Sequence, residues 1–185
     1  MTFGRIGWLD LFRGCAVLVV GIVLAGCSAG PRGPFPERPA DIDVSTVDLC
    51  AALTAEERAD LGVEPGEART GELSNGPTRA CLWNNFDDGY NYGVQTIADG
   101  AVVAVGGDDT TVDVIDGYGV VVATAHGASA PSCSIYVDVS DAQAIRVQAQ
   151  ATKDDATGIP SFGTVCGRAS SLASTAIRNL GAAVP

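Results

Sequence analysis

The chain has 185 residues, a formal net charge of −11 and a hydrophobic fraction of 46%. This length suits a single domain. An acidic chain is repelled by nucleic acids and by anionic membrane surfaces, so the charge argues against both as partners. The sequence has no long run of like charges, and we therefore expect the acidic residues to be spread over a folded surface.

The first 26 residues have the parts of a secretory signal peptide. Arg5 and Arg13 supply positive charge, residues 15–25 form an apolar run, and small residues follow. The uninterrupted apolar run of about 12 residues is shorter than the roughly 20 that a bilayer-spanning helix needs. We expect residues 1–26 to be removed. Removal takes two positive charges and one negative charge from −11, which leaves −12.

The apolar run ends in Leu24-Ala25-Gly26-Cys27, which resembles the bacterial lipobox. In lipoproteins this motif implies that a diacylglyceryl group is attached to the cysteine and that cleavage makes it the new N-terminus. Two acyl chains hold a protein at a membrane stably. We therefore expect Cys27 to anchor the chain at the extracytoplasmic face of the cell membrane. The alternatives are an ordinary signal peptide with an incidental cysteine, or an uncleaved anchor.

Residues 27–45 are expected to be the lipidated cysteine and a proline-rich tether. The stretch contains four prolines, at positions 31, 34, 36 and 39, and no hydrophobic periodicity. At ~3.1 Å per residue, residues 28–45 would reach roughly 55 Å. The domain expected over residues 46–185 would then stand off the membrane.

Four cysteines remain after the signal peptide and the lipobox, and an even number in an exported domain predicts two disulfides. Of the three connectivities we favour the two bridges that do not overlap in sequence. Each would contribute about 3–4 kcal/mol in the chain-entropy model. Metal binding is the rival interpretation, but no pair has C-x-x-C spacing, and we expect neither a metal nor a cofactor. The favoured bridges are Cys50–Cys81 and Cys133–Cys166.

The domain is expected to begin with a short helix and continue mainly as strands. Thr54 and Glu57 have the spacing of a capping box and Gly62 stands where a helix would stop, which predicts a helix over 55–61. Residues 64–78 have the composition of a loop. Asp116-Gly117 is a strong hairpin signal. The expected strands are 79–84, 92–97, 111–115, 118–125, 133–139 and 145–151, together with a short apolar run at 101–105.

The last two of these strands alternate between apolar and polar residues, as half-buried antiparallel strands do. After them the period changes, and apolar residues recur three and four positions apart until Gly181, which predicts one amphipathic helix. The apolar positions are Val165, Ala169, Leu172, Ala173, Ala176, Ile177 and Leu180. The elements together predict an α+β fold: an antiparallel sheet of about five or six strands with the C-terminal helix on one face, a short N-terminal helix and two disulfides.

Several motifs resemble an actinobacterial lipoprotein family of unknown function (domain of unknown function 3558). They are Asp48-Leu-Cys50-Ala-Ala-Leu53-Thr54, Leu61-Gly62, Cys81-Leu-Trp83, Cys133 with Val137-Asp-Val139 and Ile145-Arg-Val147, and Cys166 in an Ala/Leu helix. The resemblance covers most of the chain after the signal peptide. It implies a lipid-anchored envelope protein and supplies no activity or catalytic residue.

Catalytic motifs are scarce. His126 is the only histidine, no G-x-S-x-G is present, and the cysteines are better assigned to disulfides, so we expect no catalytic residue and no enzyme. Asp87 and Asp88 resemble a calcium loop, but position 3 of an aligned EF-hand loop would be Phe86, which lacks an oxygen ligand. An irregular calcium site there and a plain hairpin turn remain the alternatives.

The stretch from Trp83 to Tyr92 combines aromatic rings, amides and carboxylates, which are the materials of a binding surface. The alternative is that Trp83 and Tyr92 belong to the core, with Trp83 against the nearby disulfide, because strand aromatics usually pack inward. The candidate ligand-binding residues are Trp83, Phe86, Asp87, Asp88, Tyr90 and Tyr92.

Three functions follow as hypotheses. The first is a non-enzymatic, lipid-anchored binding module that presents a sheet face or the Phe86–Tyr92 loop to an envelope protein, glycan or small ligand. The second is an envelope hydrolase that uses His126 or acidic residues. The third is a structural spacer, which predicts no concave site.

Overall fold

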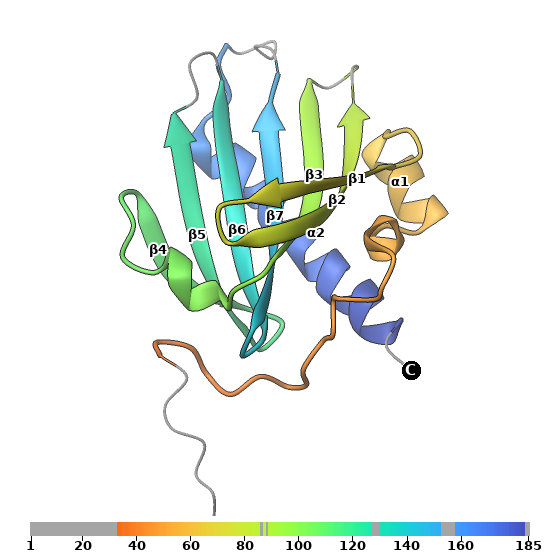
Figure 1. The fold of residues 1–185 in the computed structure, drawn as a ribbon. Coiled ribbons are helices and arrows are strands. Elements are labelled where there is room, and N and C mark those ends of the chain that lie inside the picture. Colours follow the sequence, from red (N-terminus) through yellow and green to blue (C-terminus); the bar gives the residue numbers. More distant parts are fainter. Residues whose placement is uncertain (1–32, 86, 88, 127–129, 153–157, 184–185) are drawn as a thin grey trace, which may run out of the picture. The chain divides into compact units, whose positions relative to one another are not determined.

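Seven strands form one antiparallel sheet in the order β1-β2-β3-β7-β6-β5-β4 in the computed structural model (Figure 1). The structure describes residues 33–85, 87, 89–126, 130–152 and 158–183. The strands are β1 (Glu67–Leu73), β2 (Gly76–Asn85), β3 (Tyr90–Ile97), β4 (Thr110–Ile115), β5 (Tyr118–His126), β6 (Pro131–Ser140) and β7 (Gln143–Ala151).

The C-terminal helix α2 (Phe162–Ala182) covers one face of this sheet (Figure 1). Ser161 caps it by accepting a hydrogen bond from the Thr164 amide, and the Cys133–Cys166 disulfide joins its first turns to β6. The helix passes Gly181 by one residue, since helix ends fray rather than stop at one position. The seven apolar positions expected to face the core are all buried, which confirms the amphipathic pattern.

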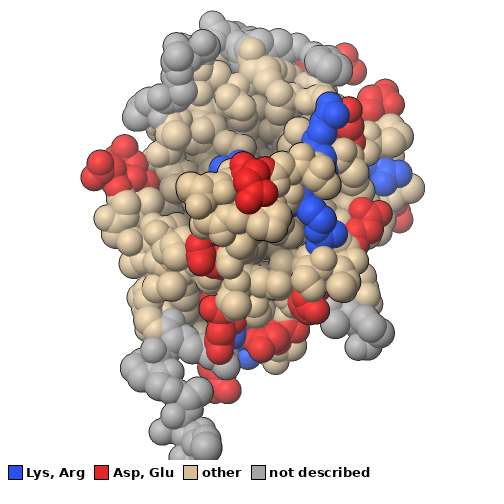
Figure 2. Space-filling model, viewed as in Figure 1, with Lys and Arg blue, Asp and Glu red and all other residues tan. Residues whose placement is uncertain are grey.

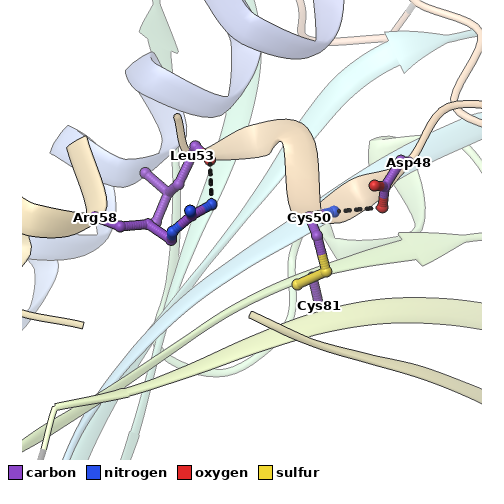
Figure 3. Close-up of a disulfide and its surroundings, with 5 residues drawn as sticks. All are labelled: Asp48, Cys50, Leu53, Arg58 and Cys81. Atoms are coloured by element: carbon purple, nitrogen blue, oxygen red, sulfur yellow. Dashed lines mark hydrogen bonds between the residues drawn. A yellow bond between two sulfur atoms is a disulfide. The ribbon is translucent and has the colours of Figure 1, made fainter. Parts of the chain in front are cut away.

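A 3-10 helix, η1 (Leu49–Ala52), and the helix α1 (Ala55–Leu61) precede the sheet. The Thr54 and Glu57 capping box is formed, and Gly62 ends α1 in the left-handed conformation, with φ 63°. The Asp48 carboxylate accepts from the Cys50 amide at 2.9 Å, beside the Cys50–Cys81 disulfide that fixes η1 to β2 (Figure 3). Both favoured disulfides are therefore present.

The sheet has more strands than the five or six expected. Strand β1 occupies residues that we expected to be loop. The sequence carries no strand signal there, because almost all of β1 is exposed and it has no apolar alternation. Backbone pairing with β2 forms it instead. The apolar run at 101–105 is not a strand but the 3-10 helix η2 (Ala101–Ala104), in which Ala101 is buried while Val102 and Val103 are exposed.

The tether expected over residues 28–45 is wrong from Phe35 onward, because that part of the chain packs on the sheet (Figure 1). The side chains of Phe35, Ile42 and Val44 are buried, and the Ile42 amide donates to the Val139 carbonyl at 2.9 Å. Phe35 lies over Gly119, where an added Cβ would stand 2.5 Å from the Phe35 Cβ. Proline content and the absence of hydrophobic periodicity suggested a tether, but a segment without regular secondary structure can also pack on a sheet.

Arg38 fastens this segment to the turn between β6 and β7. Its guanidinium donates to Asp41 at 2.8 Å, to Asp138 at 2.5 Å and to Asp141 at 2.6 Å. Burial acts to lower the pKa of Arg38, but the hydrogen bonds that it donates to the three carboxylates outweigh this effect and the pKa is raised. Arg38 therefore stays charged, and the domain includes residues 35–45 as well as 46–185.

Candidate functional site

The two faces of the sheet differ in what covers them. Alternate residues of the strands point to opposite faces, and one set forms the main core under α2. On the opposite face only one end is apolar, where a smaller cluster is sealed by the N-terminal segment and η2. That cluster consists of Phe35, Ile97, Ala101, Val121 and Ala144. The rest of this face is mainly polar, with Leu82 and Val112 as exposed apolar exceptions.

The hairpin of β1 and β2 crosses in front of this face (Figure 1). Leu73 near its tip packs against the smaller cluster, and the Asn75 amide donates to Asp99 at 2.7 Å. These contacts hold the hairpin across the sheet. Figure 2 looks onto the same face and shows it hollowed beside the hairpin. We call the polar residues of this hollowed face the polar face.

The strand register places Arg146 on the middle strand of the sheet, in the row of the polar face that borders the smaller apolar cluster. Arg146 of β7 lies between Gln95 of β3 and Tyr136 of β6. Two further cross-strand rows follow towards the end of β7, and most of their residues are partly exposed. The first row is Leu82, Gly93, Gln148 and Ser134, and the second is Asn84, Asn91, Gln150 and Ser132.

Arg146 differs from the other arginines that the sheet buries. Its Nε atom is buried without a hydrogen-bond partner, and none of the described residues forms an ion pair with its guanidinium. Arg38 is bound by three carboxylates, and Arg79 donates to the carbonyls of Val44 and Val47. Burying part of a charged group without a partner is unfavourable. The guanidinium of Arg146 can therefore gain by donating hydrogen bonds to an acceptor on a ligand.

The aromatic residues predicted as a binding surface lie in the core instead. Trp83 and Tyr92 are at most 2% exposed, so the inward alternative was correct for them. Tyr90, which that alternative did not include, is also buried, at 3% exposure. An added Cβ on Gly66 would stand 2.5 Å from the Trp83 Nε1 and would also contact the disulfide sulfur of Cys81, which places Trp83 beside that bridge.

Tyr90 and Tyr92 are occupied by helix α2. Arg168 lies 4.0 Å above the Tyr90 ring centroid and donates to the Tyr92 hydroxyl at 2.7 Å. The remaining residues of the predicted loop are not brought into a common site: Asp87 is exposed, and Phe86 and Asp88 lie outside the described residues.

His126 ends strand β5, and its side chain lies outside the described residues. Within the described part of the chain, no three His, Cys, Asp or Glu side chains gather as a metal site would require. Nor does any helix of that part have the length and apolar character of a membrane span.

A groove of about 510 Å³ lies between α1 and α2, lined in part by Glu57 and Arg168. Both of these charged groups already have partners. The Glu57 carboxylate accepts from Asn179 at 2.7 Å and belongs to the capping box, while Arg168 contacts the two tyrosines. The groove therefore offers fewer unused polar groups than the polar face.

Sequence reasoning placed Gln148, Gln150 and Arg146 on the outward side of their strand but did not assign them to a site. The signal was their composition. Solvent-facing strand positions often carry Lys and Glu, whereas this face carries mainly amides and hydroxyls around Arg146, with Glu67 and Arg69 paired on β1.

The fold and the polar face define a disulfide-bonded α+β domain with one sheet face covered by a helix and the other partly open. Residues 22–179 match the family model described as a protein of unknown function, DUF3558, and the chain belongs to this family. No match was found among curated proteins or among solved structures. The family description names no activity, so function has to be argued from the site.

Proposed function

We propose that this chain is a lipid-anchored binding protein of the bacterial cell envelope, whose polar face holds a ligand outside the cytoplasmic membrane. The observation that carries the proposal is Arg146, a partly buried guanidinium with no partner among the described residues, on the middle strand of a hollowed sheet face. Protein groups of this kind gain free energy when a ligand supplies the missing hydrogen bonds.

The chemistry of the polar face supports binding rather than hydrolysis. Apart from Glu67 and Arg69, which pair with each other, its described polar side chains are mainly amides, hydroxyls and the Arg146 guanidinium, none of which serves readily as a general base near neutral pH. Asp138 lies at the same side of the sheet, but its carboxylate is bound by Arg38. These residues recognise polar groups by hydrogen bonding and leave them unchanged.

Anchoring through Cys27 would hold the domain close to the membrane. Because the chain packs on the sheet from Phe35 onward, only residues 28–34 are left as a linker. At about 3.1 Å per residue, these seven residues reach about 22 Å. The ligand is therefore expected within the first few nanometres outside the bilayer, rather than at the roughly 55 Å that the sequence alone predicted.

Anchoring is tested by mass spectrometry of the N-terminal peptide from the natural host. We expect an acylated Cys27 as the first residue, and release of a Cys27→Ser variant from the membrane fraction. An unmodified residue 1–26 segment on the exported protein would contradict the anchoring.

Binding is tested by amide-shift mapping of residues 28–185 with solubilised envelope polysaccharide and with envelope protein. We expect shifts on β6 and β7 around Arg146 and Gln148, and none around Glu57 in the groove between the helices. A spacer predicts no shifts, and a hydrolase predicts cleaved products; either result would refute a binding role.

A further inference from the structure

We infer that the ligand of the polar face is an acidic carbohydrate, with its anionic group on Arg146 and its hydroxyl groups on the surrounding amides. This inference rests on the proposed function and names the chemical class that the face accepts. It follows from the charge of Arg146, the side chains around that charge, and the position of the face in the middle of the sheet.

The charge of Arg146 requires an anion from outside. Two acidic groups that the register places on this face are already paired: Asp138 binds Arg38, and Glu67 binds Arg69 at 2.5 Å. The chain as a whole carries a net charge of −11, so a positive charge without an acidic partner contrasts with the overall charge of the protein. The planar guanidinium matches the geometry of a carboxylate or a phosphate group, because it offers two parallel N–H donors.

The side chains around Arg146 match hydroxyl groups. A sugar hydroxyl both donates and accepts, and so does each amide of Gln95, Gln148 and Asn91. None of these amides forms a side-chain hydrogen bond with another described residue. Leu82, which is 41% exposed, and the partly buried Tyr136 ring add apolar surface for the C–H faces of a sugar ring.

The position of the face disfavours an extended peptide as the ligand. Peptides commonly bind sheets by pairing with an unpaired edge strand. Strands β3, β7 and β6 are paired on both sides, so their backbone groups are already used. Recognition at this face depends on side chains, and a ligand rich in hydroxyl groups matches them better than a peptide backbone does.

The inference is tested by calorimetric titration of residues 28–185, which contain the whole compact unit of residues 31–185. The probes form two matched pairs: trigalacturonate with its fully methyl-esterified form, and mannose 6-phosphate with mannose. The first pair tests a carboxylate and the second a phosphate, and each partner keeps the hydroxyl groups while losing the charge.

Three variants test whether Arg146 binds the anionic group of the probe. Arg146→Gln removes the guanidinium, and Arg146→Lys keeps a positive charge without the planar fork. Arg69→Gln is the matched control, because Arg69 lies in the same cross-strand row as Arg146 but is 58% exposed and paired with Glu67. Circular dichroism confirms that each variant keeps its fold.

We expect at least one acidic probe to bind about tenfold to hundredfold more tightly than its neutral partner. Arg146→Gln should abolish this difference, Arg146→Lys should retain part of it, and Arg69→Gln should leave it unchanged. Equal binding of acidic and neutral probes, a difference that survives Arg146→Gln, or no binding of any probe would overturn the inference. In those cases shifts on the polar face with envelope fractions would still support the proposed function.

Discussion

Replacing Arg38 by methionine tests whether residues 35–45 belong to the folded domain. The Arg38 side chain is 1% exposed and Asp138 is 7% exposed, whereas Asp41 and Asp141 are mostly exposed. The substitution keeps much of the apolar stem and removes the charge. It therefore leaves the Asp138 carboxylate buried without a cation, which is the costly part of breaking a buried ion pair.

The magnitude follows from the burial of each partner. Removing one member of a buried pair costs about 3–5 kcal/mol, while an exposed pair contributes at most about 1 kcal/mol. We expect Arg38→Met to lower the free energy of unfolding by about 3–5 kcal/mol, mostly through Asp138. The double variant Arg38→Met/Asp138→Asn should recover part of this loss, because it buries no unpaired charge.

Urea unfolding of residues 28–185, with the disulfides intact, measures the change. Arg178→Met is the matched control, since that side chain is 57% exposed and lies 3.9 Å from Glu57. It should cost less than about 1 kcal/mol. Equal losses for Arg38→Met and Arg178→Met would refute the conclusion that Arg38 fastens the segment to the sheet.

Three further predictions concern stability. Gly119→Ala should displace Phe35 and cost about 1–3 kcal/mol in urea unfolding, whereas Gly167→Ala, with open space at its Cβ, should be neutral or stabilising. Burial raises the pKa of Glu57, but hydrogen bonds from Thr54 and Asn179 outweigh it and the pKa is lowered. Its stabilising effect is present above the ordinary glutamate pKa and is lost as pH falls through the lowered value, so the deficit of Glu57→Gln should shrink in acid. A chain starting at residue 46 should unfold at lower urea than residues 28–185, since it lacks the buried segment; equal midpoints would contradict this.

Local sequence patterns were sufficient to predict the elements whose formation depends on residues close together in the sequence. The Asp116-Gly117 turn forms as expected, with positive φ at both residues, because backbone preference decides it. The helix over Phe162–Ala182 buries the seven predicted positions, because the 3.6-residue period fixes which side chains share a face.

Other features depended on partners far away in the sequence. Strand β1 has no apolar alternation and exists because β2 supplies its hydrogen bonds. Residues 35–45 look like a tether until Asp138 and Asp141, about one hundred positions later, bind Arg38. The sequence left open whether Trp83, Tyr90 and Tyr92 contribute to a binding surface, and the strand register turns all three inward.

The sequence by itself determined the α+β class and the faces of the last strands and helix, because short-range periodicity and turn chemistry encode them. It favoured the observed cysteine pairing among three connectivities without fixing it. Only the tertiary structure decided which polar side chains were left without partners. Whether Arg146 is paired depends on every element that passes near it, and that is a property of the assembled sheet rather than of any short stretch of chain.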